Sequence, residues 1–450
     1  MALISVLVVL CAGFAALDYV QGPKLSTATV DTSQAVAQAD QQLRLFANQN
    51  VSAVRKSQVT ITPATPFSVS AGGQVISVQF SERLRYATRY TVRVAGVTSL
   101  YQDRPQTFRY SFTTGAARVY YLDRADPAAG GGQPDTILRT SLGDTGRTIV
   151  YSAPRIQQFV VYARVIVVSS LNDDNTSSLS IVSLSGGPVE RVQLPEPGVV
   201  DDLQVAPQTG IVGFEFTGSG EGAGYSGDLM TLDLAGAHTV QPVLGIDSRS
   251  LAVLAWAFIG SSTSLVAQAE DRTMLLIDAK KPGSVTPLRQ YAELDGVCPD
   301  GTAIVVGDAL GNKLVSSLKD GAQTYLPTRP LGGATTYGGK VAILGTGTDR
   351  VQQVAVFDPD HPGAFASYLV SERGATSRIL FQTVDNKGSI DDFRVSPNGQ
   401  YVAVTVIPDV SSSVSDGYSV DAQSTSVSTV FVDVATGAVV RSVDGFDATW

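Results

Sequence analysis

The sequence predicts an all-β protein built largely from a repeated unit, and three observations lead to this prediction. Sustained apolar stretches of helical period are nearly absent from the 450 residues. Short segments rich in valine, serine and threonine are separated by turns that use the 43 glycines and 21 prolines. One motif recurs inexactly, as Asp201–Pro207 and Asp391–Pro397, and each copy leads into an apolar strand-like segment. Recurrence of such a unit is typical of repeat folds.

Residues 1–20 are a candidate membrane anchor or signal segment. The run from Ala2 to Leu17 is apolar except for Ser5, and it ends at Asp18. It is slightly shorter than the ~20 residues of a typical membrane-spanning helix. It is longer than most signal-peptide cores and lacks their basic start, so we favour an uncleaved N-terminal membrane helix over a removed peptide. This interpretation places the bulk of the chain outside the cytoplasmic membrane, in the cell envelope.

Residues 24–115 are expected to form a small β-sandwich, because short strands alternate with proline- and glycine-containing turns. The segment Ser33–Ala47 is the best helical candidate in the chain and fits a strand with a polar lead-in equally well. The predicted strands are Gln42–Phe46, Gln58–Thr62, Val75–Phe80, Tyr90–Val94 and Phe108–Thr113.

The second half of this segment resembles a known family. The pattern from Phe80 through Leu84 and Ala87 to Tyr90–Val94, followed by Tyr110–Gly115, is similar to the bacterial Ig-like domain of S-layer and other surface proteins. That family ends in a similar aromatic-Thr-Thr-Gly strand. The resemblance implies a spacer or cohesive module, with the aromatic residues in its core.

Residues 116–450 are expected to form a β-propeller. Aligned on the Asp-Asp position, the innermost strands start near residues 157, 201, 254, 293, 332, 391 and 448. The spacings between successive starts suit four-stranded blades of ~40–50 residues. A bulky apolar residue then recurs at equivalent positions, which are Phe159, Leu203, Trp256, Phe393 and Trp450.

Ring closure follows from the two ends of this region. The last unit supplies one strand near Trp450, and residues 118–152 offer three strands, so together they complete a blade and pair two open edges. Seven blades are predicted, and six or eight remain alternatives. The pattern resembles the TolB-type and WD-repeat-like propellers of bacterial envelope proteins, which implies an architecture only.

Composition limits the function. A net charge of −9 without any run of basic residues argues against a nucleic-acid partner. Two cysteines, Cys11 and Cys298, give neither a disulfide framework nor metal-ligand spacing, so we expect no metal and no cofactor. Only His238 and His361 are available for histidine-based catalysis, and both lie in predicted turns. The acidic segment from Asp123 to Asp135 lacks the ligand pattern of an EF-hand.

The repeated aspartates have two interpretations. Asp201-Asp202 and Asp391-Asp392 could be paired carboxylates near a central channel, able to bind a cation. A glycan hydrolase or lyase would need two such acids from different blades within reach of one bond. The favoured interpretation is a strand-entry turn in which aspartate accepts hydrogen bonds from nearby backbone N–H groups.

Two long loops, 217–228 and 409–428, interrupt the repeat and are the best candidates for binding. A disordered insertion is the alternative for each. The candidate binding residues in them are Tyr225, Asp228, Asp416, Tyr418 and Asp421.

Together these observations lead us to expect an exported, membrane-anchored, non-catalytic binding or scaffold protein. Its partner would be an envelope protein, a peptide or a cell-wall glycan, with no nucleic acid. The carboxylate-dependent enzyme is the alternative, and fold alone does not separate the two.

Overall fold

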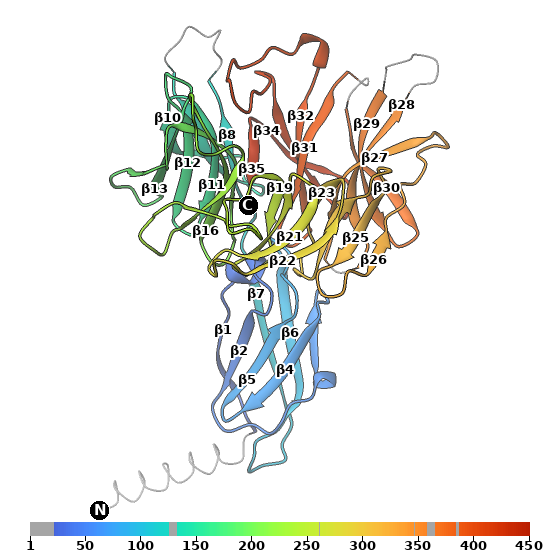
Figure 1. Cartoon of the computed structure of the whole chain (residues 1–450). Coiled ribbons are helices and arrows are strands. Elements are labelled where there is room, and N and C mark those ends of the chain that lie inside the picture. The colour runs from blue at the N-terminus through green and yellow to red at the C-terminus, as the bar shows by residue number, and fades with distance from the viewer. Residues whose placement is uncertain (1–21, 126–132, 261, 346, 358–364, 384–386) are drawn as a thin grey trace, which may run out of the picture. The chain divides into compact units, whose positions relative to one another are not determined.

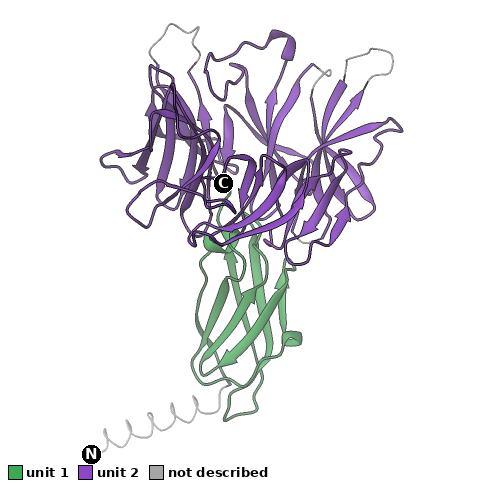
Figure 2. Cartoon of the chain, in the orientation of Figure 1, with its two compact units in different colours: residues 1–117 green, residues 118–450 purple. Residues whose placement is uncertain are grey.

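The computed structural model describes residues 22–125, 133–260, 262–345, 347–357, 365–383 and 387–450. The chain divides into two compact units, residues 1–117 and 118–450 (Figure 2). Helix is rare in these ranges; the short segments are α2 (Gln34–Ala37), η1 (Lys56–Gln58) and η4 (Val410–Ser412). None of the helices in them is long and apolar enough to cross a membrane. The predicted membrane helix at residues 1–20 lies outside the described residues.

The first unit is a sandwich of two antiparallel sheets (Figure 1). One sheet has the order β1-β2-β5-β4 and the other β3-β6-β7. Alternate side chains of the central strands are buried in one shared core, as period-two patterning requires. The strands are β1 (Leu25–Thr29), β2 (Gln42–Ala47), β3 (Val59–Thr62), β4 (Phe67–Gly72), β5 (Val75–Phe80), β6 (Arg89–Val97) and β7 (Gln106–Thr113).

All five strands predicted for this segment are present, and two further strands were missed. The missed strands, β1 and β4, are both edge strands with serine- and threonine-rich sequences and no fully buried residue. An edge strand buries fewer side chains, so its apolar pattern is weak. Residues 33–47 contain both of the expected features, a one-turn helix and then strand β2.

The second unit is a β-propeller of seven four-stranded antiparallel sheets, the number predicted from the repeat spacing (Figure 1). The first strands of successive sheets lie against one another or are joined by ion pairs, and we call these seven strands the inner ring. They are β35 (Phe446–Thr449), β11 (Ile156–Tyr162), β15 (Gly198–Val205), β19 (Val253–Phe258), β23 (Glu293–Val297), β27 (Thr336–Ile343) and β31 (Ser389–Val395).

The other strands of each sheet follow in chain order toward the outside. Sheet one continues with β8 (Arg118–Asp123), β9 (Asp135–Ser141) and β10 (Arg147–Ala153), and sheet two with β12 (Val165–Leu171), β13 (Ser177–Ser183) and β14 (Glu190–Val192). Sheet three continues with β16 (Ile211–Gly218), β17 (Asp228–Asp233) and β18 (Gln241–Pro242), and sheet four with β20 (Ser264–Ala269), β21 (Thr273–Asp278) and β22 (Val285–Gln290).

The remaining three sheets have the same order. Sheet five continues with β24 (Ala303–Gly307), β25 (Lys313–Ser317) and β26 (Gln323–Tyr325). Sheet six continues with β28 (Arg350–Phe357), β29 (Phe365–Arg373) and β30 (Thr376–Gln382). Sheet seven continues with β32 (Tyr401–Ile407), β33 (Ser428–Asp433) and β34 (Val439–Asp444).

The predicted ring closure is present. Strand β35 pairs with β8, so that Phe446 lies opposite Leu122 and Thr449 opposite Tyr120. Phe446 is buried in the core between sheets one and two, and Trp450 packs edge-on against Phe431 of sheet seven with ring centroids 5.9 Å apart. The first sheet therefore joins the two ends of the unit and leaves β8 with no open edge.

Every strand of the inner ring carries a register shift of the β-bulge kind, either in its first residues or near its middle. A bulge inserts an extra residue and redirects its side chain. In several strands that extra residue is acidic: Asp202, Asp295, Asp391 and Asp447 lie in the bulges of β15, β23, β31 and β35. The backbone φ angles of Asp202 and Asp447 are positive, 45° and 53°. The recurrent Asp-Asp motif is thus the sequence of a bulge in the inner ring.

Candidate functional site

The loop between β16 and β17 uses its two predicted binding residues in its own fold. The ring of Tyr225 packs edge-on against Phe216 at 5.9 Å between centroids, and its carbonyl oxygen accepts a hydrogen bond from Gly218 N at 3.0 Å. Asp228 is buried, and its Oδ2 accepts from Ser226 N at 2.6 Å. Both residues hold the loop against the third sheet, so their role in binding stays a prediction.

Asp416 and Asp421, in the loop between β32 and β33, surround a buried arginine at the end of β8. The guanidinium of Arg124 is 3% exposed and contacts Asp416 Oδ2 at 2.5 Å. The same group donates to three backbone carbonyls, of Asp421 at 2.9 Å, Ile156 at 3.0 Å and Gln157 at 2.8 Å. We call this cluster the Arg124 tie. It joins sheets one and two to the long loop of sheet seven.

Tyr418 completes the Arg124 tie. Its ring lies 3.9 Å from Arg124 Cζ, and its hydroxyl donates to Asp135 Oδ2. Asp135 also accepts from the backbone N–H groups of Ala125 at 2.9 Å and Ile156 at 2.7 Å. Burial, and then the bond to Asp135, raise the pKa of the Tyr418 phenol above its usual value. The long loop is therefore fastened to the propeller by the residues predicted to bind a partner.

A second group of polar residues lies along the inner ring of the third sheet. Asp201 and Glu215 are directly opposite each other on β15 and β16, and Asp202 is next in the chain. Like charges in such a pair are unfavourable. Burial, and then the charges of Asp202 and Asp201, raise the pKa of Glu215 to about 7. Burial raises the pKa of Asp202 to about 6, although the hydrogen bond that its carboxylate accepts from Gln204 lowers it.

The opposite part of the inner ring contains cations. Lys340 Nζ contacts Asp392 Oδ1 at 2.5 Å, and Arg394 contacts Asp447 Oδ1 at 2.7 Å. The charge of Asp447 is the main cause of a raised Arg394 pKa, and Asp202 contributes. Charges on different sheets of the ring therefore influence one another.

Acids outnumber bases among the charged residues on and beside the inner ring. On the inner strands the acids are Asp201, Asp202, Glu293, Asp295, Asp391, Asp392 and Asp447, and the bases are Lys340 and Arg394. Glu215 of β16 lies opposite Asp201, and Lys313 of β25 pairs with Glu293 and Asp295, so we count both with this group. Burial raises the pKa of Asp421 in the long loop, and the charges of Asp447 and Asp201 add to this rise against the charge of Arg124. We call these residues the acidic ring site. It is anionic overall and attracts cations.

The four repeated aspartates lie within strands β15 and β31 and not in turns, and Asp201 makes the expected hydrogen bond to nearby backbone. Asp201 Oδ1 accepts from the backbone N–H of Asp202 at 2.8 Å, and from Gln158 Nε2 at 2.9 Å. Asp202 instead binds the Gln204 side chain at 3.0 Å, and Asp392 binds Lys340. The favoured interpretation was therefore wrong for Asp202 and Asp392, whose carboxylates bind side chains instead of nearby backbone N–H groups.

His238 contacts residues outside the acidic ring site and the Arg124 tie. His238 Nδ1 is 2.7 Å from Glu190 Oε1, and Glu190 raises the pKa of its imidazole. His361 is outside the described residues. Cys298 is buried and free, and burial raises the pKa of its thiol to about 11. In the described part of the chain, no three His, Cys, Asp or Glu side chains are arranged to hold a metal ion.

We expect the stability of this protein to depend on Glu215 in a pH-dependent way. The pKa of Glu215 is about 7 in the folded protein and near 4.5 in the unfolded chain. The folded state therefore loses stability as pH rises through this range, because the buried carboxyl becomes charged. Glu215→Gln should therefore raise the free energy of unfolding by about 1–2 kcal/mol at pH 8, after allowance for solvent screening. Urea unfolding followed by circular dichroism measures this difference.

The difference should disappear at pH 4, where Glu215 is protonated in both states. Glu221→Gln, at an exposed loop position, is the matched control and should change neither value. Equal effects of Glu215→Gln at pH 4 and pH 8 would contradict the predicted linkage.

No protein-family model and no curated protein sequence matches this chain. Among solved structures, it is similar to a protein provisionally assigned as a 6-phosphogluconolactonase from Bacteroides uniformis, at 14% identity and a TM-score of 0.42, over 72% of this chain and 94% of that one. It is similar to TolB from Acinetobacter baumannii, at 12% identity and a TM-score of 0.36, over 85% and 81%. A third similar structure is the β-propeller domain of Cps50 (Swd1) from Myceliophteria thermophila, at 9% identity and a TM-score of 0.41, over 65% and 87%.

All three TM-scores lie below 0.5, so we draw no functional conclusion from these similarities. The architecture rests on the seven sheets and their closure. They define a β-propeller protein, joined to a small β-sandwich in the same chain.

Proposed function

We propose that this chain is an exported, membrane-anchored binding or scaffold protein without catalytic activity. It acts outside the cytoplasmic membrane, at the cell envelope, through its propeller. The apolar sequence between Ala2 and Leu17 supports export and anchoring. The observation that carries the binding function is the acidic ring site, to which several different sheets contribute charges.

The partner that best suits the acidic ring site is a protein or peptide segment rich in lysine and arginine. The carboxylates exceed the cations there, and the ion pairs Lys340–Asp392 and Arg394–Asp447 hold the side chains in place before a partner arrives. Preorganised charges favour binding because less side-chain freedom is lost. The same negative charge disfavours nucleic acid.

The first unit is proposed to be an Ig-like spacer. Its strand order, β1-β2-β5-β4 in one sheet and β3-β6-β7 in the other, is the order of a seven-stranded immunoglobulin sandwich of the constant type. Tyr90, near the start of the sixth strand, accepts a hydrogen bond on its hydroxyl from Arg85 N at 3.1 Å. A tyrosine at this corner bound to upstream backbone is a further feature of that fold.

A cationic peptide tests the proposed binding site. A fluorescein-labelled peptide of alternating lysine and glycine should bind the full-length chain, more weakly as salt rises. Asp391→Lys, at an exposed position of the ring, should weaken that binding at least tenfold by fluorescence anisotropy. Glu221→Lys makes the same charge change at an exposed loop position and should have a much smaller effect. Equal losses in both variants, or no binding by the wild type, would argue against the acidic ring site.

The partner itself is sought in envelope extracts. Wild type and Asp391→Lys are compared as baits, because deletion of residues 409–428 would also remove the partners of Arg124. We expect a basic protein or peptide that is retained by the wild type and lost from Asp391→Lys. Identical captured proteins would count against the ring.

A carboxylate-dependent glycan hydrolase or lyase is the second candidate. The observation in its favour is Glu215, with a pKa of about 7, beside the two aspartates Asp201 and Asp202. A protonated carboxyl next to ionised ones is the division of roles that glycosidases use. Release of reducing ends from cell-wall glycan by the wild type, lost at least a hundredfold in Glu215→Gln, would establish this activity. No release by the wild type would exclude it for that substrate.

A further inference from the structure

Three large aromatic side chains are exposed together on the sixth sheet. Tyr337, Phe357 and Phe365 are 55%, 49% and 46% exposed. Tyr337 lies opposite Ala355, and Phe357 lies opposite Phe365, so all three project from one face of strands β27, β28 and β29. Single exposed apolar residues need no explanation, whereas a contiguous group of them indicates a binding surface.

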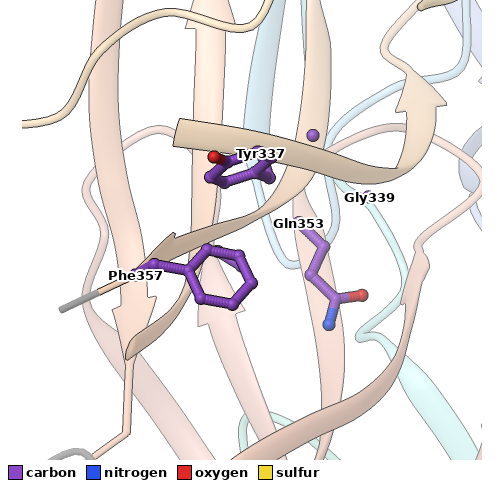
Figure 3. Close-up of a pocket in the computed structure, with 6 residues that line it drawn as sticks. Tyr337, Gly339, Gln353 and Phe357 are labelled. Atoms are coloured by element: carbon purple, nitrogen blue, oxygen red, sulfur yellow. The ribbon is translucent and has the colours of Figure 1, made fainter. Parts of the chain in front are cut away.

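The aromatic rings form two walls of a pocket. The rings of Tyr337 and Phe357 are perpendicular, at 87° with centroids 4.9 Å apart, and Phe365 extends the group at 6.1 Å from Phe357. The pocket has a volume of about 550 Å³, within the range of small-molecule sites. Figure 3 shows the two rings beside each other, with the Gln353 side chain next to them.

Polar groups border the rings. Gln353 Nε2 donates to Ile390 O of the neighbouring inner strand at 3.0 Å, which fixes the amide and leaves its Oε1 to accept from a ligand. The bulge in β27 lies between Gly338 and Val341, so the backbone at Gly339 is outside the regular ladder.

Two adjacent glycines, Gly338 and Gly339, lie at one edge of the pocket. A Cβ on Gly338 would lie 2.3 Å from Thr328 Oγ1, which excludes a side chain at this position without local movement. A Cβ on Gly339 would lie 3.4 Å from the carbonyl oxygen of Gln353. Gly338 pairs with Val354, so its tight contact lies on the face of the sheet opposite Tyr337 and Ala355. The contact at Gly339 is an ordinary van der Waals distance. The backbone of both glycines lines the pocket.

None of the side chains that line the pocket is charged. The lining residues are Tyr337, Gly338, Gly339, Gln353, Ala355 and Phe357. A cationic or anionic ligand would have no opposite charge among them. A sugar ring matches this arrangement: its C–H face packs on an aromatic ring, and its hydroxyls hydrogen-bond to an amide and to backbone groups.

We propose that this pocket on the sixth sheet binds a neutral sugar unit of a glycan. The site uses residues different from those of the acidic ring site and goes beyond the proposed function. A chain with both sites would hold a glycan and a basic protein segment at once. No catalysis is required at the pocket, whose side chains position a saccharide by contact.

Calorimetric titration of the full-length chain with neutral oligosaccharides tests the proposal. The probes are the β-1,4-linked tetramers of N-acetylglucosamine and of glucose, and the α-1,4-linked tetramer of glucose. We expect at least one probe to bind with saturation. Tyr337→Ala and Phe357→Ala should each weaken that binding at least tenfold, and Tyr337→Trp should retain it. Tyr101→Ala, at an exposed tyrosine of the first unit, should have no effect.

Several results would overturn the proposal. One is a wild type that binds none of the three probes, and another is binding that Tyr337→Ala and Phe357→Ala leave unchanged while both variants keep the wild-type circular dichroism spectrum. A phenylalanine-containing peptide that binds only when Tyr337 is intact, without sugar binding, would assign the pocket to a protein partner. Binding of the lysine-glycine peptide should be the same in Tyr337→Ala and wild type, so failure of this site and failure of the acidic ring site are distinguishable.

Discussion

Arg124→Ala should lower the free energy of unfolding by about 3–5 kcal/mol, because removing one partner leaves a buried charge without compensation. Asp416 is 4% exposed and would lose its ion pair, and three backbone carbonyls would lose a donor. Urea unfolding measures the loss. Limited proteolysis should show faster cleavage within residues 409–428, since the Arg124 tie no longer holds that loop.

Two controls define this effect. Arg249→Ala removes an exposed arginine in a longer, 3.8 Å ion pair and should change stability by less than about 0.5 kcal/mol. Arg124→Ala combined with Asp416→Ala should cost clearly less than the sum of the single losses, because both residues act in one network. If Arg124→Ala unfolds at the same urea concentration as the wild type, the tie contributes nothing to stability.

Removal of residues 446–450 should open the ring and cause association. Without β35, strand β8 presents its unpaired edge, and edges of this kind pair with other chains. The contacts of Phe446 and of Trp450 are lost as well. We expect concentration-dependent oligomers in size-exclusion chromatography with light scattering, and thermal unfolding at a lower temperature.

A point substitution in β35 distinguishes the loss of one buried side chain from the loss of the whole closing strand. Phe446→Ala keeps the strand and should cost about 3–5 kcal/mol, since the ring is buried at 4% exposure. Val439→Ala, on the outer strand β34 with 58% exposure, should change little. A truncated chain that stays monomeric with wild-type stability would show that β35 is dispensable.

The repeat could be predicted from the sequence because a bulky apolar residue recurs at an equivalent position in five of the seven units, at Phe159, Leu203, Trp256, Phe393 and Trp450. The inner strand of sheet six, β27, was expected to start near residue 332 and begins at Thr336. A tight glycine-containing turn at residues 331–334 precedes it. The bulges could not be foreseen, because an extra residue in a strand has no signature apart from pairing. The Asp-Asp motif was the available signal, and it fits a turn equally well.

The functional residues were harder to predict than the fold. Arg124 and Asp416 are separated by 292 positions, and no local pattern relates them. Asp123–Asp135 drew attention only as a possible calcium loop, whereas Asp135 accepts hydrogen bonds from the chain itself. Tyr337 and Phe357 lie on different strands and resemble ordinary core residues in the sequence. Their exposure becomes visible only when the hairpin of β28 and β29 is placed in the sheet.

The pairing of β8 with β35 also determines when the first sheet can form during translation. Strand β8 is made early, and its partner follows more than 300 residues later. Translation at about 5–20 residues per second leaves this edge unpaired for many seconds. Sheets two to seven contain all of their strands within one continuous stretch and can pair as they emerge. The first sheet of the nascent chain therefore stays incomplete until the other six sheets have been translated. During this time the unpaired edge of β8 is a defined site for chaperones to cover.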